Sequence, residues 1–316
     1  MPSFILRRIF SLVFVLLIAV TATFCLLRLA PGNPFALNEK QSSPETIAAE
    51  ERKHDLDGPI WWQCVRYLGL AKKNSGHVGG LIEGDLRECL KFKDRTVAEL
   101  IAQALPVSAI LGAAALLLST TIGVWLGSVA AVRKNTWLDS ATMLGALAAI
   151  SVPTFVTGPA LVLIFSLWLG WLPVGGWGGI SSLILPSLTL AGPFIAYIAR
   201  LTRTSMLEVL NQDFVRTAHA KGLGERRVLY KHVLKVGILP VVSFLGPLTA
   251  NLLTGSLVIE SVFSLPGMGG FFVNSVLNRD VFLCCGSVTI YCTLLVGMNL
   301  LVDIAYKWLD PRIRLE

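Results

Sequence analysis

The sequence predicts an all-α membrane protein with six transmembrane helices and a small helical subdomain outside the membrane, between the first helix and the second. Of its 316 residues, 54% are hydrophobic and only 15% are charged, whereas a soluble domain carries about 25% charged residues. The mean hydropathy is +0.67. Six apolar runs are long enough to cross a bilayer, which takes roughly 20 residues of helix. This composition excludes a soluble enzyme, a disordered chain and a secreted disulfide scaffold.

Residues 1–29 form a short N-terminus and the first predicted span. Arg7 and Arg8 precede an apolar run, 9–29, which is interrupted only at Arg28. A signal peptide has an apolar core of about 7–15 residues and then a small-residue cleavage site. This run is longer and no such site closes it. We therefore expect a retained transmembrane helix.

Residues 30–99 differ in composition, because they hold ten basic and eleven acidic side chains. The segment opens with a turn-forming stretch, 31–34. Ser43-Pro44-Glu45 then has the pattern of a helix start, with an N-cap, a proline and an early acid. This helix is expected to end near Asp55. After a glycine–proline pair, residues 60–68 predict a second, amphipathic helix. The segment is too small for an independent core, and we expect a subdomain attached to the membrane part.

Five further spans follow within residues 100–316, which we expect to form the transmembrane core. Their approximate bounds are 104–132, 138–168, 183–206, 238–260 and 283–306. Prolines inside these runs are tolerated in membrane helices when neighbouring groups satisfy the freed carbonyls. Six spans place both termini on the same side of the membrane.

Basic residues decide which side that is. Those in the termini and the short connections gather on one face, namely Arg7, Arg8, Arg133, Lys134, Arg200, Arg203, Arg216, Lys221, Arg226, Arg227, Lys231, Lys235, Lys307, Arg312 and Arg314. An excess of lysine and arginine marks the cytoplasmic side. Both termini are therefore expected in the cytoplasm, and 30–99 is expected to be exported. The net charge of +7 reflects this topology, and the sequence gives no reason to expect nucleic-acid binding.

No pattern of catalytic or metal-binding residues is present. The sequence lacks H-E-x-x-H, G-x-S-x-G and Walker A motifs, and its histidines have no ligand partners at helical spacing. We expect neither a metal nor a cofactor on this chain. Glu208, Glu260 and Asp303 lie at the ends of predicted helices, where solvated carboxylates are expected. The paired broken helices of many secondary transporters are also missing.

The loop 209–238, between the fourth and fifth spans, is rich in helix formers. Small residues, 217–221, lead to Gly222, which is suited to end a helix, and Glu225 begins another apolar pattern. The loop therefore predicts two short helices joined at 222–224. Two interpretations remain open from the pattern alone: its small residues enter a groove on a partner, or its basic residues lie on anionic lipid.

Several short motifs, in order along nearly the whole chain, carry a family resemblance. They are Leu29-Ala30-Pro31-Gly32-Asn33-Pro34, Gly84-Asp85-Leu86, Pro106-Val107-Ser108-Ala109, Asn135-Thr136-Trp137-Leu138-Asp139, Trp171-Leu172-Pro173 with Gly175-Gly176-Trp177, Ala199-Arg200-Leu201-Thr202-Arg203, Phe263-Ser264-Leu265-Pro266-Gly267-Met268-Gly269, Asn278-Arg279-Asp280 and Leu309-Asp310-Pro311-Arg312-Ile313. Together they resemble the B-type permeases of oligopeptide and dipeptide ABC importers. Loop 209–238 resembles the EAA loop of such permeases.

The resemblance implies a non-catalytic permease of the type I ABC importer fold. It implies a heterodimer with a second homologous permease, two cytoplasmic ATPases that bind ATP and Mg²⁺, and an exported substrate-binding protein. In such permeases this loop carries a coupling helix that docks on an ATPase. Here the docking residues would be Arg216, Thr217, Ala218, His219, Ala220, Lys221, Gly222, Glu225 and Arg226. The loop departs from the general pattern in three ways. Arg216 begins its motif in place of glutamate, His219 replaces an expected arginine, and Pro240 lies farther along the chain from Gly222 than the proline of the general pattern does.

Other residues are candidates for a role in transport or stability. The candidates for a gate or pathway are Asn251, Glu260, Pro266, Gly267 and Gly269. Cys64 and Cys89 both fall in the segment expected to be exported, where disulfides persist. The sequence leaves open whether they form a bridge or remain free thiols.

We therefore expect a multi-pass permease of the bacterial inner membrane that imports oligopeptides when its ATPases close on ATP. The stretch 106–115 and Lys91-Phe92-Lys93-Asp94 are closest to the oligopeptide branch. Within the family, a dipeptide, a nickel chelate, glutathione or a small glycan remains an alternative cargo. A stand-alone secondary transporter is the alternative from another class, and it would depend on an ion gradient rather than on an ATPase.

Overall fold

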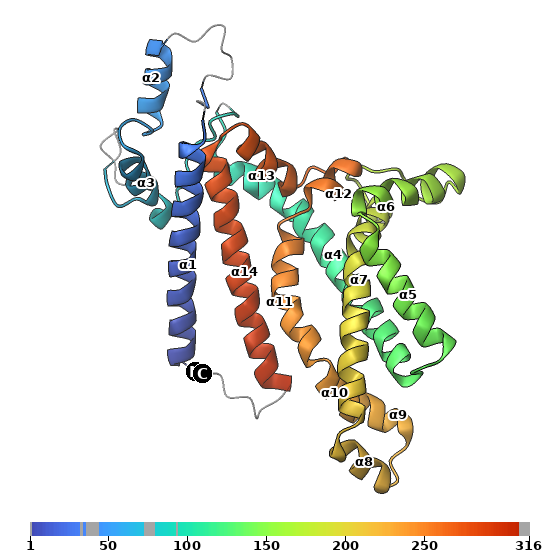
Figure 1. Cartoon of the computed structure of the whole chain (residues 1–316). Coiled ribbons are helices and arrows are strands. Elements are labelled where there is room, and N and C mark those ends of the chain that lie inside the picture. The colour runs from blue at the N-terminus through green and yellow to red at the C-terminus, as the bar shows by residue number, and fades with distance from the viewer. Residues whose placement is uncertain (1, 32–33, 36–43, 73–79, 93, 310–316) are drawn as a thin grey trace. The chain divides into compact units, whose positions relative to one another are not determined.

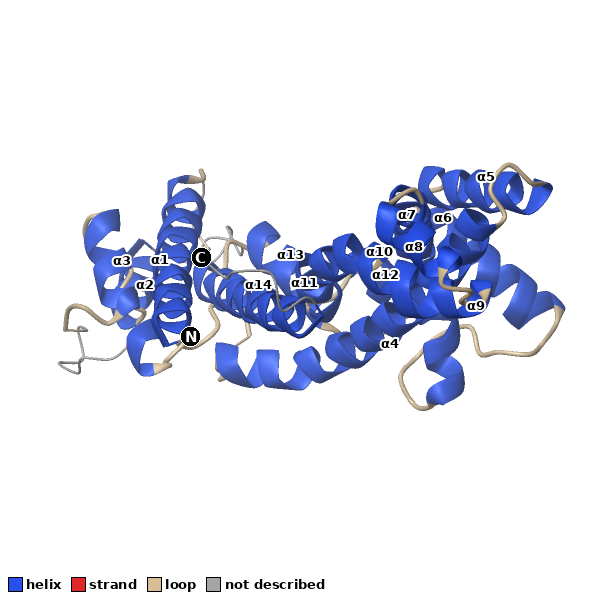
Figure 2. Ribbon diagram, turned by 90° about the horizontal axis from the view of Figure 1, so that it is seen from below, coloured by secondary structure: helices blue, strands red, loops and turns tan. Residues whose placement is uncertain are grey.

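The computed structural model describes residues 2–31, 34–35, 44–72, 80–92 and 94–309. Within these residues, helices joined by loops and turns make up the fold, with one isolated β-bridge between Glu88 and Thr96 (Figures 1 and 2). The chain forms two compact units. Unit 1 comprises Met1–Val107 and Gly267–Leu294, and unit 2 comprises Ser108–Pro266 and Leu295–Glu316. The helices α4 (Val97–Val132) and α14 (Val281–Leu309) contribute to both.

Unit 1 contains the first span and the polar segment that follows it. Its other elements are α1 (Pro2–Leu29), α2 (Pro44–Lys53), α3 (Ile60–Leu68), η1 (Leu81–Glu83) and α13 (Met268–Leu277). The predicted helix 60–68 is confirmed residue for residue, and Gly69 ends it with a φ of 86°. The helix α2 ends at Lys53, slightly before the predicted limit. Gly32, Asn33, Ser43, Lys93 and 310–313, which belong to expected motifs, lie outside the described residues.

An aromatic stack forms the centre of unit 1. The ring of Tyr67 lies 5.5 Å from that of Phe24 and 5.7 Å from that of Phe282, and both pairs are stacked. All three side chains are buried. Such pairs add about 0.5–1.5 kcal/mol each beyond the burial of their area. The stack therefore joins α1, α3 and the start of α14.

Unit 2 contains the remaining helices. They are α5 (Trp137–Ser151), α6 (Thr154–Leu161), η2 (Val162–Trp168), α7 (Ile180–Leu210), α8 (Asp213–Ala220), α9 (Glu225–Val228), η3 (Leu229–Val233), α10 (Leu234–Gly237), α11 (Leu239–Leu253) and α12 (Leu257–Val262). Glycines bring α4 against its neighbours. A Cβ on Gly127 would lie 2.4 Å from the carbonyl oxygen of Ala199 on α7, and one on Gly112 would lie 2.2 Å from that of Leu252 on α11. Small residues allow backbones in a membrane to approach this closely.

Four continuous helices are long and apolar enough to span a membrane: Phe10–Leu29, Val97–Val132, Ile180–Leu210 and Val281–Ile304. Two bent pairs raise the number to six. One pair corrects the third predicted span, 138–168, because α5 and the α6–η2 stretch meet at an angle of 105°. A proline disfavours helical geometry at the residue before it, and Val152, directly before Pro153, has a ψ of 121°.

The fifth predicted span, 238–260, is also corrected. The helix α11 ends at Leu253, and Gly255 has a φ of 94° before α12 begins. At its other end, α11 meets the helical stretch Glu225–Gly237 at a bend of 49°. The loop between spans four and five is therefore connected to α11 through helical structure.

Close packing at Gly127 makes a testable prediction. Replacing Gly127 by alanine should force α4 away from α7 and destabilise the protein by roughly 1–3 kcal/mol, the usual cost of overpacking. Gly145→Ala is the matched control, because its Cβ meets nothing within 4 Å, and it should be neutral or stabilising by up to about 1 kcal/mol. Thermal unfolding of the purified protein measures both. Equal midpoints for the two variants would contradict the close approach.

Candidate functional site

In the described part of the chain, four acidic side chains are buried, two within each unit. They are Asp55, Asp139, Glu260 and Asp280, each at most 6% exposed. A buried carboxylate is costly unless it is paired or hydrogen-bonded. Each of the four accepts hydrogen bonds from a segment distant in sequence or from an arginine. These contacts therefore position the candidate residues.

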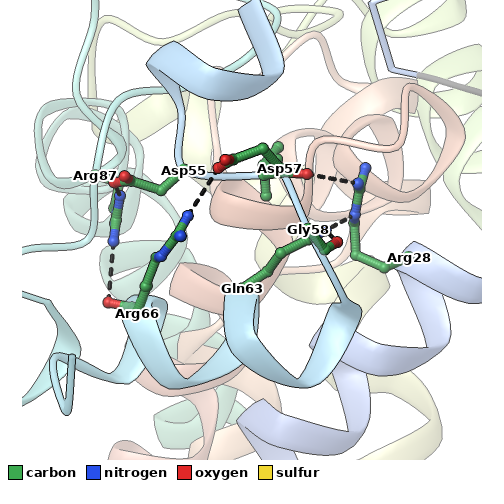
Figure 3. A network of polar contacts seen from close by, with 8 residues as sticks. Arg28, Asp55, Asp57, Gly58, Gln63, Arg66 and Arg87 are labelled. Carbon is green, nitrogen blue, oxygen red and sulfur yellow. Dashed lines mark hydrogen bonds and ion pairs between the residues drawn. The ribbon is translucent and has the colours of Figure 1, made fainter. Parts of the chain in front are cut away.

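In unit 1, three arginines organise the polar segment (Figure 3). Arg28, at the end of α1, donates to Gln63 Oε1 at 2.9 Å and to the carbonyl of Leu56 at 3.2 Å. Arg87 forms a buried ion pair with Asp55 and donates to the carbonyl of Arg66 at 3.0 Å. The charge that interrupts the first apolar run therefore attaches α3 to α1.

Arg66 completes this network. Its Nη1 lies 2.7 Å from Asp57 Oδ1, and its guanidinium carbon lies 5.9 Å from the centre of the Trp62 ring. Both contacts fix the end of α3 that Arg87 also reaches through the Arg66 carbonyl. The polar segment is therefore held by charge and hydrogen bonds at both ends of α3.

The sequence left open whether Cys64 and Cys89 form a bridge. Cys64 and Cys89 are both free thiols. The Cys89 thiol donates to Asp280 Oδ2 at 2.7 Å, and the same oxygen accepts from the backbone of Leu90 and Lys91 at 2.8 and 3.1 Å. Burial first, and then the charge of Asp280, raise the pKa of Cys89 to about 12. Because the thiolate is the reactive form, Cys89 is unreactive at neutral pH.

In unit 2, Asp139 connects α5 with α7. Its carboxylate accepts two bonds from Arg203, at 2.5 and 2.7 Å, and one from the backbone of Asn135 at 3.0 Å. Asn135 has a φ of 61°, so the third bond stabilises a left-handed turn. Two motifs noted separately in the sequence, Asn135–Asp139 and Ala199–Arg203, are therefore one structural element.

Glu260 is buried, which corrects the expectation of a solvated carboxylate at a helix end. It is 3% exposed, and its Oε1 accepts a 2.6 Å hydrogen bond from Ser108 of α4. Its carbonyl accepts from the backbone of Leu265 at 2.8 Å. The motif around Ser108 and the motif that begins at Phe263 therefore meet at this residue.

The turn after α12 is also held by the connection between η2 and α7. Gly176 donates its backbone N–H to the carbonyl of Phe263 at 2.8 Å. A Cβ on Gly175 would lie 2.5 Å from the same oxygen, so only glycine fits there. Ser264 follows with a φ of 53°. Contacts on both sides of the chain therefore define this turn.

The other gate candidates divide between exposed and buried positions. Asn251 and Pro266 are exposed in unit 2, whereas Gly267 and Gly269 are buried in unit 1. The structure adds a feature that the sequence analysis missed, an exposed stripe on α11 formed by Pro240, Ser243, Pro247 and Asn251. Residues three and four apart share one face of a helix. The sequence contained a signal for this stripe, because its prolines and polar residues recur every three or four positions in an otherwise apolar run.

The loop forms the two predicted short helices, which Figure 1 shows at the end of α7. The helix α8 ends at Ala220, and Gly222 adopts a φ of 75° before α9 begins. Val215, Ala218 and Val228 are buried in a small core beneath the loop. A left-handed glycine and this core therefore hold the two helices in place.

Eight of the nine predicted coupling residues are exposed: Arg216, Thr217, His219, Ala220, Lys221, Gly222, Glu225 and Arg226. Ala218, 6% exposed, faces the core of the loop. Phe214, which the sequence analysis did not single out, is 39% exposed on α8. Phe214 and Thr217 of α8 and Lys221, its C-cap, are exposed at spacings of three and four residues, and together they define the outer face of α8.

The arrangement offers contact surfaces rather than catalytic chemistry. Among the residues that the structure describes, no group of three or more histidine, cysteine, aspartate or glutamate side chains is placed to hold a metal ion. The buried acids connect helices, and the exposed features are the stripe on α11 and the outer face of α8.

Comparison with known proteins identifies the class. Residues 123–315 match the family "Binding-protein-dependent transport system inner membrane component", and residues 1–111 match the N-terminal region of such components. The chain therefore belongs to the family of binding-protein-dependent inner-membrane transport components. It is a non-catalytic, multi-pass permease of an ABC transporter, which works with a binding protein and an ATPase.

Individual relatives extend over the whole chain. The oligopeptide transport system permease protein OppB of Salmonella typhimurium is 44% identical over 99% of this chain and 100% of its own length. OppB of Escherichia coli K12 is 43% identical over the same shares. The dipeptide transport system permease protein DppB of Bacillus subtilis is 37% identical over 100% of this chain and 99% of its own length. The expected family is confirmed.

The bond between Asp139 and Arg203 predicts a coupled pair. Arg203→Gln removes both donors from a buried carboxylate and should destabilise the protein by about 2 kcal/mol. Combined with Asp139→Asn, it should cost clearly less than the sum of the two single changes. Arg200→Gln is the matched control, because Arg200 is exposed and only lies over the Tyr197 ring. Thermal unfolding of the four variants provides the measurement, and strictly additive effects would contradict the pairing.

Proposed function

We propose that this chain forms one half of the path of an oligopeptide importer and that α11 lines that path. The observation that carries the proposal is the exposed stripe on α11. Ser243 and Asn251 on this stripe are polar and its other two members are prolines. The exposed residues of α5, in contrast, include Leu144, Leu147 and Ile150.

The exposed side chains of α11 and of α5 suit different surroundings, water for the first and lipid for the second. Polar groups inside a membrane face a water-filled cavity or another helix, because facing lipid is costly. Leucine and isoleucine have no such cost. The stripe on α11 is therefore proposed to face a path shared with a second homologous permease, and the exposed face of α5 is proposed to face lipid.

The partners follow from the same design. A second permease completes the path, and two ATPases bind ATP and Mg²⁺ on the cytoplasmic side, so this chain itself needs no cofactor. An exported binding protein delivers the cargo. The bias of the basic residues supports cytoplasmic termini and an exported segment 30–99.

The outer face of α8, with α9, is proposed to dock on an ATPase. It presents Phe214 between charged and small side chains, and an exposed aromatic is a typical anchor for a partner pocket. The loop is connected to α11 through the helical stretch Glu225–Gly237. Movement of the ATPase would therefore reach the path helix through rigid structure rather than through a flexible linker.

The proposed cargo is an oligopeptide. The relatives named for oligopeptide transport are 43–44% identical, against 37% for the dipeptide permease. Dipeptides, glutathione and nickel chelates are the alternatives within the same machinery. A separate binding protein selects the cargo in this design, so the permease residues discriminate poorly among them.

Uptake by whole cells tests the cargo. Deleting the gene should abolish uptake of labelled tri- to pentapeptides, and the restored gene should recover it. Labelled dipeptide, glutathione and nickel uptake are measured in parallel. Loss of one of these with unchanged oligopeptide uptake would reject the cargo while keeping the permease. Uptake that survives inactivation of the ATPase would reject the class of machinery.

A bulky residue on the proposed path face should block transport. Asn251→Trp is expected to reduce peptide uptake at least tenfold, because an indole fills the path. Leu144→Trp is the matched control, since Leu144 is 66% exposed on α5 and tryptophan is tolerated against lipid; its uptake should stay near that of the wild type. Equal effects of the two variants on uptake, at equal protein levels in the membrane, would contradict the path assignment.

Gly222 and Gly224 offer a matched pair in the coupling loop. A Cβ added to either glycine would meet no atom within 4 Å, but only Gly222 has a positive φ. Gly222→Val should therefore distort the junction between α8 and α9, at a cost of about 1–2 kcal/mol. We expect weaker co-purification of the ATPase subunits and lower uptake.

Gly224→Val is the control, because its φ of −61° and ψ of 146° suit any residue. It should retain the ATPase subunits and transport. Membrane insertion should be unchanged in both variants. Normal ATPase association in Gly222→Val would count against docking through this loop.

A further inference from the structure

A groove within unit 2 lies beside the loop proposed to dock on an ATPase and shares Glu225 and Arg226 with it. It runs between the second half of α4 and the helical stretch from α9 to α10, and it encloses a volume of about 810 Å³. Its walls are mainly apolar, with Val124 and Val129 on one side and Leu229 and Leu234 on the other. Ala131, one of the last residues of α4, packs in one core with Val228 of α9, so the end of α4 lies beside the loop. The groove therefore has a distinct end at the loop.

Charge gathers at that end. Arg133, directly after α4, and Arg226, in the first turn of α9, both line the groove and are both exposed. Glu225 lines the same end, so the three side chains leave an excess of one positive charge there. Lys134 and Arg227, next to the two arginines in sequence, are also exposed. The rest of the lining is uncharged.

The length of the groove matches one leaflet of a bilayer. Its lining on α4 extends from Thr120 to Arg133, which is about 20 Å of helix at 1.5 Å per residue. Half of a bilayer, counted with its headgroup region, is also about 20 Å thick. A ligand with a charged head at Arg133 and a chain reaching Thr120 would therefore fit within a single leaflet.

Two large aromatic side chains on the lining remain exposed. Trp125 of α4 is 63% exposed and Tyr230 is 69% exposed. Such side chains have an apolar body and a polar tip, and they are enriched at the interface between membrane and water. Their exposure on both walls shows that the groove is open along its side within unit 2.

We propose that the groove binds an anionic phospholipid of the cytoplasmic leaflet. The phosphate contacts Arg133 and Arg226, and one acyl chain lies between the apolar walls on α4 and α9–α10. Basic pockets between helices on the cytoplasmic side attract anionic headgroups. The site goes beyond the proposed transport function and rests on the orientation proposed for it. A bound lipid would join α4 to the helical stretch that connects the coupling loop with α11.

Native mass spectrometry of the complete purified transporter tests the headgroup contact. The transporter is titrated with phosphatidylglycerol and with phosphatidylcholine of the same chain length. The wild type should bind phosphatidylglycerol about tenfold more tightly than the double variant Arg133→Gln/Arg226→Gln. Lys235→Gln, which removes an exposed charge outside the groove lining, should bind like the wild type. Equal affinity of the wild type and the double variant would overturn the headgroup assignment.

A second variant tests the chain contact without changing charge. Thr121 lines the groove and is exposed, so Thr121→Trp should fill the apolar end and weaken the binding of both lipids. Unchanged binding of both lipids would overturn the proposed place of the acyl chain. These readouts do not depend on transport, so they remain valid if the cargo assignment fails.

Photo-crosslinking distinguishes lipid from protein as the occupant. A photoreactive amino acid replaces Trp125 in the complete transporter, in membranes that contain phosphatidylglycerol. An adduct with the phospholipid, lost in the Thr121→Trp background, is the expected result. An adduct with the second permease subunit would show that protein covers the groove and would overturn the proposal.

Discussion

The cost of burying a carboxylate is the constraint on which the rest of this structure depends. A buried acid needs hydrogen-bond donors or a positive partner at a fixed distance, so the segment that supplies them cannot move independently. The four pairs join segments far apart in the chain, namely Asp55 with Arg87, Asp139 with Arg203, Glu260 with Ser108 and Asp280 with Cys89. The segments between them form the exposed stripe on α11, the coupling loop and the polar segment.

Backbone contact supplies the second constraint. Without water in the bilayer, every backbone polar group needs a partner within the protein, so a bend in a membrane helix requires nearby support. The turn after α12 shows how this is met, because Gly176 donates to the carbonyl of Phe263 and Gly175 leaves room for that contact. Gly112 and Gly127 of α4 add backbone contact of another kind, because they let α4 pack closely against α11 and α7.

Local features were predictable from sequence, and long-range partners were not. The helix 60–68 and the junction at Gly222 were predicted correctly, since amphipathic spacing and a left-handed glycine act over a few residues. The third span was predicted as one helix, because hydropathy does not detect the restriction that Pro153 places on Val152. Glu260 was expected in solvent, because nothing near it in sequence points to Ser108. A bridge from Cys64 to Cys89 stayed open for the same reason, because nothing near Cys89 in sequence indicates that its thiol bonds to Asp280.

The sequence by itself determined the class of protein, the number of apolar runs, the family and the position of the two short helices in the loop 209–238, because each is encoded in composition or in neighbouring residues. Only the tertiary structure decided which face of α11 is exposed, which acids are buried and where α4 leaves a groove against α9–α10. Those features arise when helices from distant parts of the chain pack together. Packing at this level depends on the shapes of both partners at once, and a single sequence read along its length does not contain that pairing.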